Sequence, residues 1–179
     1  MTIYTPLRTA VRNVALVANN TYPTMPVIHS HQNGAEPAES YVSINILSVE
    51  QKGGHSTSTL TRVDETLDIR VAYEVLIQFS FFGSLSGNAS HSFTQRIKNN
   101  PWVVEELAKN KLGSMRKSTL RRAPQKRDTQ WVEAFNMDVT FSYFINTNEL
   151  VDVVEGVVIS DETGEIPVII KIPETITYP

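Results

Sequence analysis

The residues that could bind a metal ion are few in this sequence. His29 and His31 form the most metal-like pair, because two histidines at positions i and i+2 of a strand share a face and imidazole is a common metal ligand. No HExxH pattern or acidic cluster supplies a third ligand at an obvious spacing. We therefore expect an unliganded pair in a loop-like region, and we expect no cofactor.

Signatures of catalysis are also missing. The sequence has no GxSxG nucleophile elbow, and the glycine-flanked stretch Gly83–Gly87 lacks the Lys-Ser/Thr pair that follows in a phosphate-binding loop. The acids Asp161, Glu162 and Glu165 match a calcium loop in composition but not in spacing. The chain has no cysteine, which excludes thiol catalysis, disulfides and zinc–thiolate sites. The sequence therefore favours a protein that is not an enzyme.

The best functional candidate is a basic segment, residues 109–127, which contains no acid. The chain is strongly acidic from Asp128 onward, where Lys171 is the only base. Such asymmetry can be satisfied within the chain, between neighbouring copies or by nucleic acid. We expect six basic side chains of this segment to form a subunit or partner interface. They are Arg116, Lys117, Arg121, Arg122, Lys126 and Arg127.

Three interpretations of the basic segment stay open. It could contact a partner or a neighbouring copy, whose acidic tail would supply the opposite charge. It could form a solvated strand edge, because unpaired charges protect sheet edges from aggregation. It could also contact phosphates, although a net charge of −3 is a weak footprint for a DNA-binding protein.

Two long alternating stretches must position this segment. From Leu67 to Phe81 every odd-numbered residue is apolar, and from Trp131 to Ile145 all but Glu133 are. Polar residues occupy most of the even positions. A period of two places each set on its own face of a strand, so these stretches predict two long strands with one apolar face.

Three helices are predicted from capping residues that precede apolar residues at helical spacing. The predicted starts are Thr5–Pro6, Ser90 and Asn100–Pro101. The residues of the predicted buried stripes are Leu7, Val11, Val14, Ala18, Phe93, Ile97, Trp102, Val103 and Leu107.

Shorter segments complete the predicted order of elements. Strand signals lie at Val27–Ile28, Tyr41–Val49, Leu150–Ile159 and Ile166–Ile172, while 51–59 and 146–148 are typical of turns. The sequence therefore predicts an α+β fold, with a mostly antiparallel sheet of long strands and helices packed on one face. Its length predicts a single domain over residues 1–179, and no apolar run is long enough to cross a membrane.

The order of these features resembles the neck or tail terminator proteins of tailed bacteriophages. Three stretches carry the resemblance. One is QNGAEPAESYVSINILSVE, Gln32 to Glu50, and the next is the long strand LDIRVAYEVLIQFSFFG, residues 67–83. The third is RDTQWVEAFNMDVTFSYF, Arg127 to Phe144, a tryptophan-led strand that follows a basic stretch.

The resemblance implies a structural virion protein with no catalytic residues. Such proteins form a ring, usually of six copies, that caps the tail tube and joins it to the head connector. The implied partners are further copies of the chain, the tail tube protein, the connector or neck proteins and, transiently, genomic DNA. The implied location is the tail or neck of the virion, after assembly in the host cytoplasm and without a membrane.

A binding module is the alternative from a different class. It would use the basic segment 109–127 and exposed aromatic side chains to bind nucleic acid or carbohydrate.

Overall fold

A computed structural model of the protein describes residues 3–19, 25–61, 66–127, 129–150, 156–159 and 168–171. The chain divides into two compact units. One comprises Met1–Thr57 with Arg70–Asn146, and the other comprises Ser58–Ile69 with Thr147–Pro179. The single domain over residues 1–179 stays a prediction.

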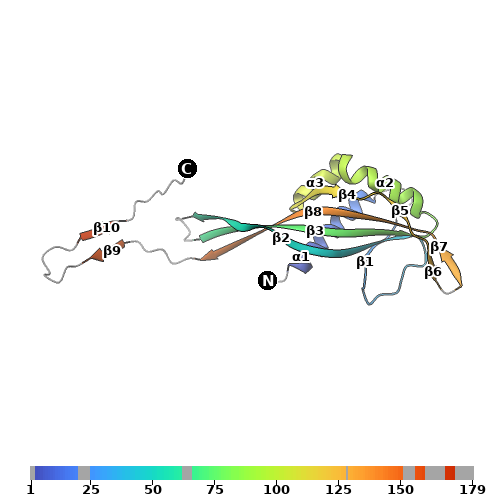
Figure 1. Cartoon of the computed structure of the whole chain (residues 1–179), viewed down its shortest axis with the longest axis horizontal. Coiled ribbons are helices and arrows are strands. Elements are labelled where there is room, and N and C mark those ends of the chain that lie inside the picture. Colours follow the sequence, from blue (N-terminus) through green and yellow to red (C-terminus); the bar gives the residue numbers. More distant parts are fainter. Residues whose placement is uncertain are drawn as a thin grey trace. The chain divides into compact units, whose positions relative to one another are not determined.

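Helices and strands follow one another in the order shown in Figure 1. The elements are α1 (Tyr4–Ala18), β1 (Val27–His29), β2 (Tyr41–Thr61), β3 (Thr66–Phe82), α2 (Ser86–Asn99), α3 (Pro101–Lys109), β4 (Leu112–Lys117), β5 (Arg121–Arg122), β6 (Gln125–Arg127), β7 (Gln130–Val132), β8 (Ala134–Leu150), β9 (Gly156–Ile159) and β10 (Val168–Lys171).

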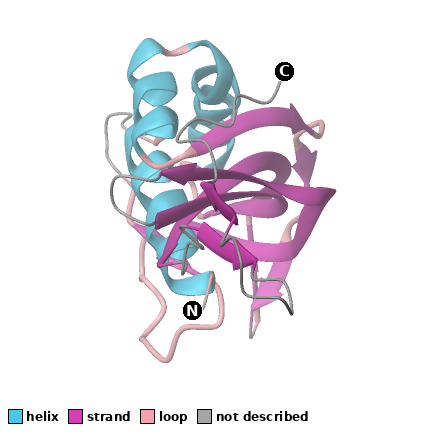
Figure 2. Cartoon of the chain, turned by 90° about the vertical axis from the view of Figure 1, so that its left-hand side faces the viewer, coloured by secondary structure: helices cyan, strands magenta, loops and turns pink. Residues whose placement is uncertain are grey.

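The main sheet has the strand order β1-β2-β3-β8-β4, and β5 also pairs with β8. β1 runs parallel to β2, whereas β4 and β5 run antiparallel to β8. The helices, cyan in Figure 2, lie together on one side of the sheet. The predicted fold class is therefore confirmed: α+β, with long, mostly antiparallel strands.

The core lies between this sheet face and the three helices. Alternate residues of β3 and β8 are buried there, as the period of two predicts. The ring of Phe79 lies 4.9 Å from that of Phe93 on α2 and 6.4 Å from that of Phe141 on β8. The tilted and edge-on arrangements of these rings are those that aromatic pairs prefer. One aromatic cluster therefore joins α2 to both long strands.

Two helices start earlier than predicted, α1 by about half a turn and α2 by more than one turn. α1 begins at Tyr4, so Thr5 lies inside the helix and caps nothing. α2 begins at Ser86, and the hydroxyl of Ser90 donates instead to the Gly87 carbonyl within the helix. In both cases the residue before the helix already has helical backbone angles, so the helix extends beyond the sequence signal.

The start of α3 is as predicted. The Asn100 side chain accepts hydrogen bonds from the amides of Trp102 and Val103, and Pro101 follows it. Val103 and Leu107 are buried, but Trp102 is 70% exposed, so its place in the buried stripe was wrong. A nine-residue helix buries only a narrow stripe, which Val103 and Leu107 fill.

Three predictions about strand ends are also wrong. β2 runs through the predicted turn at 51–59, and β8 runs through that at 146–148. Pairing with β3 sustains both strands, which overrides the local turn signals. The predicted strand from Trp131 is broken, because Trp131 belongs to β7 and β8 starts at Ala134.

In the other unit, the two predicted C-terminal strands are present. β9 and β10 form an antiparallel pair in which Val168 lies opposite Ile159. The polar loop predicted between them lies outside the described residues.

Replacing Phe79 with alanine should lower the free energy of unfolding by about 3–5 kcal/mol, because the side chain is fully buried between α2 and β8. Urea denaturation followed by circular dichroism measures this change. Leu47→Ala is the control, since Leu47 is 47% exposed and its loss should change stability by no more than about 0.5 kcal/mol. Equal effects of the two substitutions would contradict this core.

Candidate subunit interface

The basic segment folds into short strands beside β8. β4 forms one edge of the main sheet, β5 pairs with β8 further along, and β6 pairs with β7 in a small hairpin. Even-numbered residues of β3 and β8 alternate with the core residues and therefore lie on the outer face of the sheet, away from the helices. Arg116 of β4 and Arg121 of β5 reach acidic side chains on this outer face.

Glu74 of β3 is the centre of one charged group on the outer face. Arg116 extends from β4 across β8, where its Nε donates to the hydroxyl of Thr140 at 3.3 Å. Its guanidinium then pairs with Glu74 at 2.8 Å. Lys52 of β2 approaches the same carboxylate at 3.3 Å. Glu74 thereby connects two basic side chains on the same face, one from β2 and one from the edge strand β4.

Asp138 of β8 is the centre of a second group. Its carboxylate pairs with Arg121 at 2.5 Å and accepts a hydrogen bond from the amide of Gln78 at 3.2 Å. Its backbone amide donates to the hydroxyl of Ser118 at 3.0 Å. These contacts hold the connection between β4 and β5 against β8.

Arg122 forms a bidentate ion pair with Glu133, in which Nε donates at 2.5 Å and Nη2 donates at 3.0 Å. The hydrogen bond from Arg122 lowers the pKa of Glu133, and the bond to Glu133 raises the pKa of Arg122. Both shifts favour the charged forms, so this pair stays ionised across the neutral pH range.

Lys117 faces the other side of the sheet. Its ammonium group donates to the backbone carbonyl of Thr94 on α2 at 2.6 Å. This lysine therefore joins the edge strand to a helix and is half-buried.

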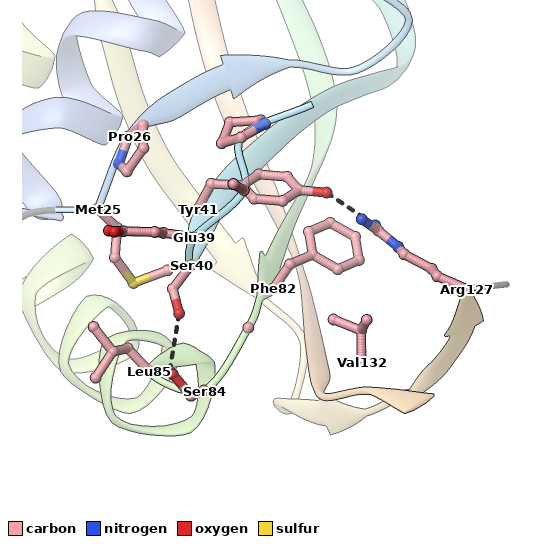
Figure 3. Close-up of a pocket in the computed structure, with 13 residues that line it drawn as sticks. Met25, Pro26, Glu39, Ser40, Tyr41, Phe82, Ser84, Leu85, Arg127 and Val132 are labelled. Atoms are coloured by element: carbon pink, nitrogen blue, oxygen red, sulfur yellow. Dashed lines mark hydrogen bonds between the residues drawn. The ribbon is translucent and has the colours of Figure 1, made fainter. Parts of the chain in front are cut away.

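Arg127 lies in a cluster of aromatic side chains at the end of the sheet (Figure 3). Its guanidinium lies 4.7 Å from the centre of the Phe82 ring, and it donates to the Tyr41 hydroxyl at 2.9 Å. It also pairs with Glu36, to which the Tyr41 hydroxyl donates. Burial raises the pKa of Tyr41, so its hydroxyl remains protonated.

This cluster is where the three stretches that resemble terminator proteins meet. Tyr41 comes from the first stretch, Phe82 from the second and Arg127 from the third. They line a pocket of about 440 Å³. The turn at Gly83 closes one side: its φ is +93°, and a Cβ there would lie 2.4 Å from the Ser40 hydroxyl. Glycine is therefore needed for this close approach.

The hairpin β6–β7 projects an unpaired cation and a large aromatic side chain. Lys126 lies opposite Trp131 in the ladder, so their side chains share a face. Trp131 is 71% exposed, and the Lys126 side chain makes no hydrogen bond or ion pair with any described residue. Arg127, the next residue, anchors the hairpin to the sheet from the opposite side.

The structure therefore separates the six predicted interface residues by their contacts. Arg116, Arg121, Arg122 and Arg127 pair with carboxylates of their own chain, and Lys117 binds a backbone carbonyl. Lys126 is the one member of the set with neither an ion pair nor a hydrogen bond to a described residue. This internal pairing weakens the case for nucleic-acid binding, because paired arginines add little net positive potential.

Sequence reasoning missed a second basic site, formed by Arg8, Arg12 and His29. It assigned α1 to packing alone and considered His29 only with His31. Burial, and then the charges of Arg8 and Arg12, lower the pKa of His29. Two arginines four residues apart on one helix face, with no acid nearby in the sequence, were the available signal.

The described residues place no third potential metal ligand beside His29 and His31. His31 is exposed, and no group of three potential metal ligands occurs within the described ranges. None of the helices in the part of the chain that the structure describes is long and apolar enough to cross a membrane.

Comparison with known proteins identifies the family. The family model described as "Phage neck terminator protein" matches residues 1–166. The chain also resembles the PVC sheath/tube terminator of an extracellular contractile injection system, solved by cryo-EM in the extended state. The identity is 12% and the TM-score 0.41, over 90% of this chain and 65% of that one, so the chain spans less than two thirds of that protein's length. No curated protein matches the chain.

The chain belongs to the phage neck terminator protein family, since the family model covers most of its length. It is accordingly a structural component of the phage virion, located in the tail or neck region, and not an enzyme. The resemblance stated from the sequence is confirmed.

Proposed function

We propose that this chain is the tail terminator of its phage. It forms a homo-oligomeric ring, most simply a hexamer, that caps the tail tube and joins it to the head connector. The match of the family model over residues 1–166 carries the proposal. The tail tube protein and the connector or neck proteins are the proposed partners, and assembly takes place in the host cytoplasm.

A closed ring needs two different patches on each subunit, because one patch of a subunit meets another patch of its neighbour. The β6–β7 hairpin, which joins the end of the basic segment to Trp131, provides the first patch. Trp131 offers a large apolar surface beside the charge of Lys126, and tryptophan is frequent among the residues that dominate binding energy at interfaces. Arg127 supports this hairpin through its contacts with Glu36, Tyr41 and Phe82.

The proposal includes transient contact with the passing genome, but through fewer basic side chains than the sequence suggested. Lys126 is the side chain of the basic segment best placed for it, since the arginines are engaged with carboxylates. A dedicated nucleic-acid binding module finds less support for the same reason.

Electron microscopy of phage lysates tests the function. With this gene interrupted by an early stop codon, we expect filled heads beside unattached or overlong tails, because nothing ends tube growth or provides the joint. Supplying the intact gene in trans should restore joined particles. Normal, infectious particles from the interrupted gene would contradict the proposal.

Replacing Trp131 with alanine tests the proposed interface. We expect the association constant between subunits to fall about thirtyfold, the equivalent of about 2 kcal/mol for an interface anchor. Mass photometry of the purified protein across a concentration series measures the loss of rings.

Trp102→Ala is the matched control, because Trp102 is 70% exposed on α3 and lies outside the β6–β7 hairpin. It should assemble as the wild-type protein does. Unchanged assembly of Trp131→Ala, with its circular dichroism spectrum also unchanged, would exclude the hairpin from the interface.

A further inference from the structure

A groove beside α1 gathers positive charge that the described part of the chain does not neutralise. Arg8 and Arg12 lie one turn apart on the exposed side of α1, and His29 projects from β1 beside them. The groove has a volume of about 320 Å³. Its lining consists of Thr5, Arg8, Thr9, Arg12, Asn13 and His29.

This groove differs from the basic segment in its partners. Every arginine of the basic segment has a carboxylate beside it, whereas Arg8 and Arg12 have no ion pair with a described acid. His29 lines the same groove, and burial, and then repulsion by the charges of Arg8 and Arg12, lowers its pKa. A bound anion would relieve this repulsion and would accept hydrogen bonds from both guanidinium groups.

Acids that could occupy the groove come from one part of the sequence. Among the described residues, most carboxylates already have a basic partner, as Glu36, Glu74, Glu105, Glu133 and Asp138 do. By contrast, residues 149–174 contain seven acids and a single lysine. Since the whole chain has a net charge of −3, the remainder is net positive, and a second copy supplies complementary charge.

We propose that the groove binds carboxylate side chains of the acidic segment, residues 149–174, of a second copy of this chain. The proposal rests on the self-association proposed above and adds a second contact to it. Arginines four residues apart on a helix lie close enough to hold two neighbouring carboxylates. A net-acidic chain with two arginines that have no ion pair among the described residues suits an acidic peptide better than a nucleic acid.

Charge reversal in two full-length chains tests this contact. One chain carries Arg8→Glu and Arg12→Glu, and the other carries Asp161→Lys, Glu162→Lys and Glu165→Lys. Each chain alone then opposes like charges across the contact, whereas a mixture restores opposite charges. We expect the two variants to bind each other at least tenfold more tightly than either binds itself, with a dependence on salt. Microscale thermophoresis of one labelled variant against the other measures this.

A third chain, with Lys98→Glu and Lys111→Glu, is the matched control for net charge, because both lysines are exposed and lie outside the groove. This control chain and the wild-type chain should bind the chain with Asp161→Lys, Glu162→Lys and Glu165→Lys equally tightly. Circular dichroism establishes that each variant is folded.

Three results would overturn the proposal. The first is a mixture that associates no more tightly than each variant alone. The second is association that returns only when both reversals lie in one chain, which would place the contact within a chain. The third is a DNA duplex that binds the wild-type chain and not the groove variant. The pairwise measurement is independent of tail morphology, so its failure and that of the proposed function are distinguishable.

Discussion

The alternation of β3 and β8 is the constraint on which the rest of the structure depends. Phe79 and Phe141 face the helices, and this fixes Glu74 and Asp138 on the opposite face. A shift of one residue in either strand would place the carboxylates in the core and the phenyl rings in water. The aromatic core thus determines where the basic strands β4 and β5 find their partners. The packing on one face and the charge pairing on the other both follow from the alternation of side chains along β3 and β8.

Charge pairing then divides the surface into parts whose charged side chains have partners among the described residues and parts whose side chains do not. Exposed ion pairs contribute little to the free energy of folding, so the outer-face pairs matter mainly because they orient β4, β5 and the hairpin. Arg127 does the same through Phe82 and Tyr41, and leaves Lys126 and Trp131 on the free side of the hairpin. A head-to-tail ring needs such places, where one chain retains surface or charge that only another molecule can cover.

The sequence predicted those features that periodicity controls. It identified the long strands, the buried stripes of the helices and the Asn100 cap, because burial repeats along each element. It misplaced features that depend on tertiary pairing. The glycines and serines after Gln51 resemble a turn, yet pairing with β3 keeps them in β2. It located the basic segment but not the partners of its arginines, since Glu74 is 42 positions away from Arg116. The groove at Arg8 was missed because its third residue, His29, is distant in the sequence.

A cryo-EM reconstruction of the neck of the intact virion would show directly whether this chain closes the tail tube. We expect a closed ring of this chain on the last ring of the tail tube, with the β6–β7 hairpin at each boundary between subunits. A tube whose end is covered by another protein, or this chain bound elsewhere as single copies, would contradict it.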